Sequence, residues 1–311
     1  MLPTSSFSSG GMWSGVRSWR AFSCWDPERE VAVGSSPSYP GDLVIRPFAT
    51  LDEYEACAAF QEEIWGVGFT ERVSAAILHV ANRIGGLAAG AFGEDGVLHG
   101  FVFGLTGLEG GELVHWSDML AVRSGLRDRG LGTRLKHYQR EVLLARGVRR
   151  MRWTFDPLQS RNAFVNFAKL GITTGEYVRN MYGETGSPLH KGVGTDRLVA
   201  LWEMDSDRVK GRVSGEGAYP GPSDLADLPA ALSARMRADH PVPGEPVLDL
   251  DEPALTLAIP ADIHEIIVDD TGLAVRWREA TRDAFLHYFS RGYQATELVP
   301  WGGVSLYLLE R

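Results

Sequence analysis

The stretch that decides the fold is Asp118-Met-Leu-Ala-Val-Arg-Ser-Gly-Leu-Arg-Asp-Arg-Gly-Leu-Gly-Thr-Arg-Leu-Lys136. The apolar run from Met119 to Val122 predicts a buried strand, and the glycines after it predict a turn. An amphipathic helix is expected next, because apolar residues recur at alternating spacings of four and three: Leu131, Leu135, Tyr138, Val142 and Ala145. The chain therefore passes from a buried strand through a glycine turn into a helix.

A turn of this kind at the start of a helix can bind an anion. The first backbone N–H groups of a helix have no partner within the helix, and the helix dipole adds partial positive charge there. Gly130 and Gly132 have no Cβ, so the backbone can approach a ligand closely. A phosphate group suits such a turn; the alternative is a glycine turn that binds nothing.

In this setting the spacing Arg127-x-x-Gly130-x-Gly132 resembles the pyrophosphate loop of the GNAT superfamily of acyl-CoA-dependent N-acetyltransferases. The resemblance covers roughly residues 43–205. It implies that acetyl-CoA or another acyl-CoA binds at the turn and along the preceding strand. The implied cofactor-binding residues are Leu120, Val122, Arg127, Arg129, Gly130, Leu131, Gly132, Thr133, Arg134 and Ser160. The alternatives are a solvated helix end for the arginines and core positions for Leu120 and Val122.

The order of predicted elements also resembles that family: strand, two helices, three strands, helix, strand, helix and two strands. The expected fold class is α/β (α+β), a mixed and mostly antiparallel sheet flanked by helices. A helix is expected from Leu51 to Trp65, with Thr50 as its cap, and a hairpin turn at Gly93 to Gly96. Further motifs, at residues 153–163, 195–202 and 258–262, resemble a little-characterised bacterial branch of the family. Some of its members are linked to N-acylation of amino acids.

One family motif departs from the usual pattern. Many members carry Asn-x-x-Ala-x-x-x-Tyr-x-x-x-Gly on the helix after the fifth strand. Here Ser160 replaces the asparagine and Phe167 the tyrosine, while Ala163 and Gly171 match. In many members that tyrosine can protonate the departing thiolate, which Phe167 cannot do. The motif therefore keeps the implied binding role and loses the usual general acid.

The candidate catalytic residues are Asp118, Asp156 and Tyr288. Asp118 lies four residues before Val122, where some relatives place a catalytic side chain, and strand alternation puts it on the same face as Leu120. His115 is expected on the opposite face, as a core or surface residue. Asp156 can bind the ammonium group of the acceptor, with an Asp-Pro turn as the alternative. The candidate proton donors to the thiolate are Tyr177, Tyr182 and Tyr288.

An internal repeat is expected near the C-terminus. Residues 161–171 align without gaps with residues 282–292 at an offset of 121, and Glu176 and Glu297 keep that offset. Matching Arg, Ala, Gly and Glu as well as apolar positions favours a repeated helix-to-strand unit over chance. The predicted organisation is a disordered or low-complexity extension at 1–42, the acyltransferase domain at 43–205, a linker at 206–246 and a partial repeat at 247–311. Within this linker, a short helix is possible at 229–238.

Composition and net charge disfavour several classes of partner and cofactor. The 311 residues carry a net charge of −9, which disfavours nucleic-acid and anionic-membrane partners. The two cysteines, Cys24 and Cys57, and the lack of a long apolar run favour a soluble, cytoplasmic protein. The eight histidines show no metal-ligand spacing, so no metal is expected. A small-molecule amine acceptor is expected, a homodimer is left open, and the alternative is a CoA-binding sensor without turnover.

Overall fold

The strand, turn and helix predicted at residues 118–136 form as expected in the computed structural model, which describes residues 43–127, 129–183, 192–237 and 239–311. Strand β4 (Glu112–Val122) leads through the turn into helix α3 (Leu131–Ala145). Gly130 caps the helix at φ 82°, a left-handed conformation that favours glycine. The predicted apolar face of α3 is buried except for Ala145, which is exposed at the helix end. The predicted extension, residues 1–42, lies outside the described chain.

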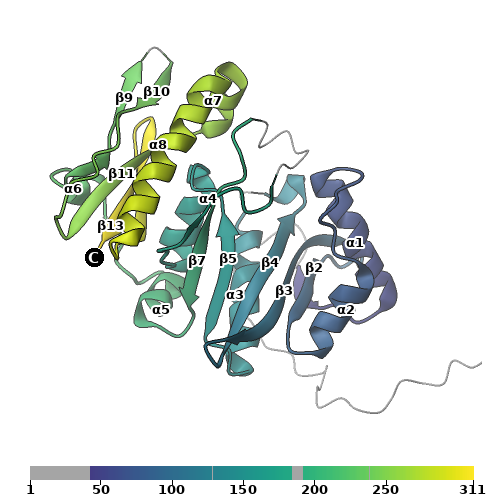
Figure 1. The fold of residues 1–311 in the computed structure, drawn as a ribbon. Coiled ribbons are helices and arrows are strands. Elements are labelled where there is room, and N and C mark those ends of the chain that lie inside the picture. The colour runs from purple at the N-terminus through teal and green to yellow at the C-terminus, as the bar shows by residue number, and fades with distance from the viewer. Residues whose placement is uncertain (1–42, 128, 184–191, 238) are drawn as a thin grey trace, which may run out of the picture. The chain divides into compact units, whose positions relative to one another are not determined.

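The main sheet has seven strands in the order β1-β2-β3-β4-β5-β7-β6 (Figure 1). Neighbouring strands are antiparallel throughout, except that β4 and β5 are parallel. The predicted mixed, mostly antiparallel sheet is therefore confirmed. The other strands are β1 (Val44–Pro47), β2 (Leu87–Phe92), β3 (Leu98–Glu109), β5 (Arg150–Phe155), β6 (Tyr177–Val178) and β7 (Arg197–Glu203).

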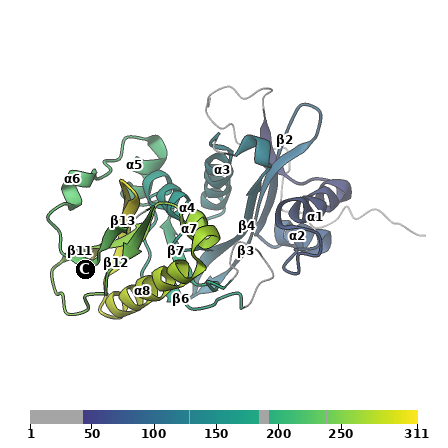
Figure 2. The ribbon, with the colours of Figure 1, turned by 90° about the horizontal axis from the view of Figure 1, so that it is seen from above.

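Helices cover both faces of this sheet. Helices α1 (Leu51–Trp65) and α2 (Ala75–Arg83) lie on one face, and α3 lies on the other (Figure 2). The Thr50 side chain accepts a hydrogen bond from the backbone N–H of Glu53, so the predicted cap of α1 is present. One apolar cluster packs under α1 and α2 and a second under α3. The sheet is thus buried on both faces, which leaves strand ends and edges as the places for chemistry.

Residues 206–246, predicted as a linker, carry regular structure. They contain helices α5 (Asp207–Ser214) and α6 (Pro222–Leu225) and three short strands, and β8 (Ala230–Leu232) pairs in parallel with β11 (Ala254–Pro260). The helix expected at 229–238 is wrong, because β8 and β9 (Ala234–Arg237) occupy that segment and β9 pairs with β10 (His240–Pro243). Burial of Ala231 and Leu232 in the core overrides the weak local helix preference there.

The C-terminal part forms a second sheet, ordered β12-β13-β11-β8. Helices α7 (Ile263–Asp269) and α8 (Thr271–Ser290) follow β11 and precede β12 (Gln294–Trp301) and β13 (Val304–Glu310). The antiparallel order β11-β13-β12 repeats the order β5-β7-β6 of the main sheet. The two parts thus share the strand order that a helix-strand repeat would have.

The two copies of the repeat meet reciprocally. Thr174 and Ala295, which are equivalent at the offset of 121, exchange both backbone hydrogen bonds, at 3.0 and 2.7 Å. Helix α8 packs against β6, while α4 (Ser160–Phe164) packs against β12. Each helix therefore contacts the strand of the other copy, as expected for two copies related by a local two-fold axis. One apolar core contains residues of both copies.

Within the described residues, no helix combines the length and the apolar character needed to cross a membrane.

Candidate functional site

Strands β4 and β5 pair at one end and separate at the other. Their paired residues are Val114 with Arg150, His115 with Met151 and Trp116 with Arg152, and the pairing stops there. Beyond this point β4 stays paired with β3 up to Val122, and β5 stays paired with β7 up to Phe155. The separation creates what we call the wedge, bounded by residues 117–122 of β4 and 153–155 of β5. The backbone edges facing the wedge do not pair with each other, so they can bind an extended ligand.

A β-bulge at Asp118 changes the faces of β4. Gly104 of β3 lies opposite Ser117 and Phe103 lies opposite Met119, so Asp118 is the extra residue. His115 and Ser117 hydrogen-bond to α3, and Leu120 and Val122 also pack against the apolar cluster under α3. The predictions that Leu120 shares a face with Asp118 and lies opposite to His115 are therefore both wrong. A bulge reverses the alternation of a strand at that point, and the sequence pattern assumed none.

The glycine turn lies beside the wedge. A Cβ added to Gly132 would meet only the side chain of Leu120, at 3.6 Å, so the first turn of α3 borders the outer part of β4. The Arg127 side chain donates to the Val122 carbonyl at 3.3 Å, and that of Arg134 donates to the Leu43 carbonyl at 3.2 Å. Arg127 and Arg129 are exposed, and Thr133 is half-buried. The turn thus places the start of a helix and exposed guanidinium groups at the open end of the wedge.

Asp118 lies on the side of the sheet that α1 and α2 cover, because its carboxylate feels the charge of Glu71, in the segment between these two helices. The residue is exposed, and its carboxylate accepts a hydrogen bond from the Trp116 indole. Partial burial raises the pKa of Asp118, and the nearby Glu71 carboxylate raises it further, against the opposing effect of Trp116. A carboxylate with a raised pKa that is open to solvent beside the wedge can accept a proton from an amine.

A buried lysine lies on the other face of the wedge. The ammonium group of Lys136 on α3 donates to the Ser117 hydroxyl at 2.7 Å and lies 3.9 Å from the centre of the Trp153 ring. The Met151 sulfur is also 3.9 Å away. Ser117 belongs to β4, and Met151 and Trp153 belong to β5, so the ammonium lies where the two strands part. Burial lowers the pKa of Lys136 to about 7.

A chain of hydrogen bonds leads away from this lysine. The Ser117 hydroxyl donates to Gln139 Oε1 at 2.9 Å, and Gln139 Nε2 lies 2.9 Å from His115 Nε2. His115 Nδ1 lies 2.9 Å from the Thr106 hydroxyl, which donates to a backbone carbonyl. These partners assign the proton of a neutral His115 to Nδ1. Burial, then the Lys136 and Arg146 charges, lower the pKa of His115 to about 3, so it is a neutral core histidine.

The sequence reasoning missed Lys136 and Gln139. Both look like members of the solvated face of α3, yet Lys136 is 7% exposed and Gln139 is fully buried. Their spacing of three residues on one helix was the available signal, since it puts two polar side chains on the same side.

Asp156 is held by protein partners. Its carboxylate accepts a hydrogen bond from the Leu158 N–H at 2.9 Å and one from Arg278 at 2.7 Å, and Arg197 lies at 3.8 Å. Asp156 thus makes the turn contact that the Asp-Pro alternative predicted, and it also forms an ion pair with Arg278 of α8. They account for a buried Asp156 without an acceptor ammonium.

Of the remaining predicted residues, Ser160, Tyr177 and Tyr288 hydrogen-bond to residues outside the wedge, whereas Tyr182 bonds a wedge residue. Ser160 is buried and shares a hydrogen bond of 2.7 Å with Ser305 of β13. Tyr288 donates to the Val247 carbonyl at 2.6 Å, within the C-terminal part, and Tyr177 donates to Asp196. These contacts give no support to the predicted cofactor role of Ser160 or to proton donation by Tyr288. Among the predicted tyrosines, only Tyr182 bonds a wedge residue in the described chain, through the Thr154 hydroxyl of β5 at 2.8 Å.

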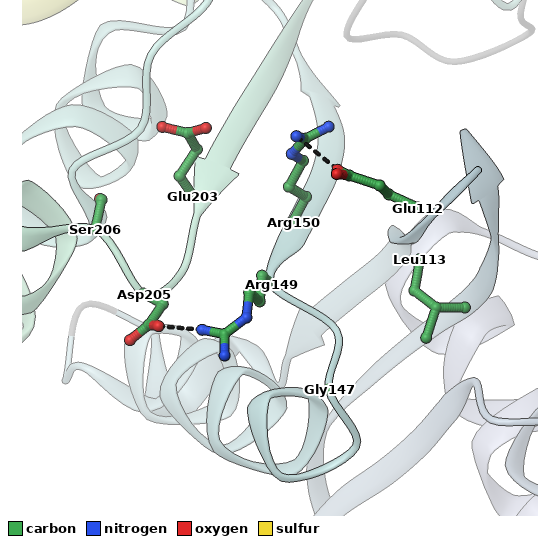
Figure 3. A pocket seen from close by; sticks show the side chains of 8 residues that line it. All are labelled: Glu112, Leu113, Gly147, Arg149, Arg150, Glu203, Asp205 and Ser206. Atoms are coloured by element: carbon green, nitrogen blue, oxygen red, sulfur yellow. Dashed lines mark hydrogen bonds and ion pairs between the residues drawn. The ribbon is translucent and has the colours of Figure 1, made fainter. Parts of the chain in front are cut away.

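A surface cavity of about 480 Å³ lies at the other, paired end of β4 and β5 (Figure 3). Four of its charged side chains form ion pairs with one another: Arg150 with Glu112 at 2.6 Å, and Arg149 with Asp205. None of the predicted site residues lines it, so the wedge remains the candidate site. The cavity is lined by Glu112, Leu113, Gly147, Arg149, Arg150, Glu203, Asp205 and Ser206. In the described chain, no group of three or more His, Cys, Asp and Glu side chains is placed to hold a metal ion.

No protein-family model and no curated protein sequence matches this chain. Solved structures of N-acetyltransferases are similar to about half of it. The ribosomal-protein-S18-alanine N-acetyltransferase from Escherichia coli is 17% identical, with 53% of this chain and 96% of that chain covered and a TM-score of 0.41. A GNAT-family acetyltransferase from Streptococcus pneumoniae is 20% identical, with 51% and 98% covered and a TM-score of 0.40.

An aminoglycoside 6'-acetyltransferase type Ii is 18% identical, with 52% and 98% covered and a TM-score of 0.42. Acetyltransferases, one of them described as a GNAT-family protein, are thus among the solved structures that this chain resembles.

Proposed function

We propose that this protein is an acyl-CoA-dependent N-acyltransferase, which moves an acetyl or other small acyl group to a primary amine of a small molecule. The observation that carries the proposal is the parting of β4 and β5 after the Trp116–Arg152 pair, with the glycine-capped start of α3 beside the opening. Acyl-CoA has a diphosphate and an arm with two amide groups. The diphosphate suits a helix N-terminus, and the arm can pair with strand edges as an added strand does.

The same geometry suggests how the reactants are placed. With the diphosphate at residues 129–133, the pantetheine arm extends into the wedge along Val122 and Leu120. Backbone N–H groups of β4 there polarise the thioester carbonyl and stabilise the oxyanion that forms on it. The acceptor amine approaches from the face of α1 and α2, where Asp118 accepts its proton. Attack of the neutral amine then forms the amide and expels the CoA thiolate.

Exposed acidic groups on that face support an amine acceptor. Asp118 and Glu71 lie close enough for the Glu71 charge to raise the pKa of Asp118. A cationic amine brought between them would relieve this repulsion between like charges. Amino acids, aminoglycosides and short peptides are the acceptors to compare, and an amino acid is the one that the family resemblance suggests.

A CoA-binding sensor is the second candidate. Phe167 stands where many family members have the tyrosine acid, and Tyr177 and Tyr288 are bonded to Asp196 and Val247. A protein that lost this acid can retain cofactor binding without turnover. Binding and turnover therefore have to be measured separately.

The test is calorimetric titration with CoA and acetyl-CoA, followed by measurement of free thiol released with a panel of amines. Gly132→Leu is the informative variant, because φ there is not positive and the nearest atom to an added Cβ is 3.6 Å away. We expect it to weaken CoA binding at least tenfold while the protein still melts cooperatively. Gly107→Leu is the matched control, since nothing lies within 4 Å of its added Cβ. Equal CoA affinity in both variants and the wild type would refute the site, and binding without any thiol release would favour the sensor.

A further inference from the structure

The ammonium group of Lys136 lies on the α3 side of the wedge, at the end where β4 and β5 part. It lies between Ser117 of β4 and the Met151 and Trp153 side chains of β5. The last two backbone pairs between the strands, His115 with Met151 and Trp116 with Arg152, adjoin these contact residues along the chain. A ligand arm that enters the wedge from its open end therefore points its tip toward this ammonium.

Lys136 has no anionic partner in the described chain. Its contacts are with a hydroxyl, a sulfur and an aromatic face, and no ion pair to it occurs among the described residues. A buried cation without a counter-ion strongly stabilises negative charge that develops next to it. The negative charge that develops in acyl transfer to an amine ends on the leaving sulfur.

We propose that Lys136 donates a proton to the sulfur of the departing CoA thiolate, in place of the tyrosine that Phe167 replaces. This inference rests on the proposed function. It assigns the two proton transfers of the reaction to two faces of the wedge: Asp118 on the face of α1 and α2 receives a proton, and Lys136 on the face of α3 supplies one.

The lone pair of the neutral amine forms the new C–N bond, and the C–S bond breaks with its electron pair moving to sulfur. The amine nitrogen gives its proton to Asp118, which passes it to solvent, and the Lys136 ammonium gives a proton to the sulfur. Lys136 takes a proton from solvent once CoA has left, so the net products are the amide and CoA thiol.

The surroundings of Lys136 keep this group titratable in the neutral range. His115 of β4 is neutral, and the Arg146 charge acts on His115 from the end of α3. The other charged or titratable side chains on the elements around Lys136 are Glu112 and Asp118 on β4, Arg150 and Arg152 on β5, and Arg134, His137, Tyr138, Arg140 and Glu141 on α3. Arg150 and Arg152 pair with Glu112 and Glu109. A proton donor whose pKa is close to the working pH transfers its proton efficiently.

The experiment compares Lys136→Met, Lys136→Arg and the control Lys169→Met, which removes an exposed lysine from the helical segment after α4. The readouts are kcat and KM for acetyl-CoA between pH 5.5 and 9.5, CoA affinity by calorimetry, and thermal melting. We expect Lys136→Met to lower kcat at least tenfold and to change KM less than about threefold. In the wild type kcat should fall on the alkaline side of about pH 7, as the ammonium is lost.

This alkaline limb should be absent in Lys136→Met and shifted above pH 9 in Lys136→Arg, because arginine stays protonated. If Lys136 had only a structural role, its replacement would not change the pH at which kcat falls on the alkaline side. If Lys136→Met does not fold, the shift in the arginine variant decides. Wild-type kcat and pH dependence in both variants would overturn the inference and leave the acyltransferase intact. A wild-type protein that binds no CoA and releases no thiol would overturn the proposed function and this inference together.

Discussion

Replacing the buried lysine by an apolar side chain should stabilise the fold. Lys136 is 7% exposed, and burial lowers its pKa from 10.5 to about 7. At about 1.4 kcal/mol for each unit of this pKa difference, burying the charged lysine costs on the order of 5 kcal/mol relative to a solvated lysine. Methionine has a similar length but loses the hydrogen bond to Ser117 and the contact with the Trp153 ring, together about 2 kcal/mol. The expected gain of Lys136→Met is therefore about 3 kcal/mol below pH 7.

The pH dependence gives this prediction its sign. Between about pH 7 and 10.5 the unfolded chain keeps its lysine proton while the folded protein has lost it, so wild-type stability rises with pH. Below pH 7 both states carry the proton and the full cost remains. The advantage of Lys136→Met should thus be largest at pH 6 and should shrink toward pH 10.

Urea unfolding of both proteins at pH 6 and pH 9.5, followed by tryptophan fluorescence, measures these differences. Lys169→Met should change stability by less than about 0.5 kcal/mol at either pH. A Lys136→Met protein that is less stable than the wild type at pH 6, or equally stabilised at both pH values, would refute the reasoning. A variant that is more stable but catalytically slower is the combination expected when a strained buried charge serves function.

Three further predictions concern other parts of the chain. Asp118→Asn should lower kcat at least tenfold, because the carboxylate form of Asp118 accepts the proton. In the wild type kcat should rise with pH as Asp118, whose pKa is raised, loses its proton, and a pH-rate profile should show no such rise in the variant. Gly130→Ala should cost about 1 kcal/mol in urea unfolding because φ is 82° there, and an unchanged midpoint would count against the left-handed cap. Arg278→Met should cost about 3 kcal/mol in urea unfolding at pH 7 by leaving the buried Asp156 without its closest charge partner, and equal stability of variant and wild type would contradict this.

Features with local causes could be predicted from the sequence. The turn at Gly130 follows from glycine spacing, and the buried face of α3 from its period of 3.6 residues. The cap at Thr50 follows from side-chain chemistry. The repeat was visible because its copies keep the same residues at a fixed offset, and the reciprocal Thr174–Ala295 bonds then explain how the copies pack.

Features that depend on distant partners could not be predicted in this way. The bulge at Asp118 exists because β4 pairs with β3 in a shifted register, and no residue in β4 marks it. Lys136 and Gln139 are polar and therefore predicted to be solvated, while Ser117 and His115 of a strand some twenty residues away provide their buried partners. Strand β8 forms because β11 supplies an edge, although its short sequence also suits a helix.

Amide hydrogen exchange with and without CoA tests the central claim most directly, because it reports on the backbone groups themselves. The account predicts that CoA slows exchange in peptides covering residues 117–122 and 129–134, and leaves the peptides of β11 to β13 unchanged. Equal exchange rates at residues 117–134 in the presence of saturating CoA would contradict it.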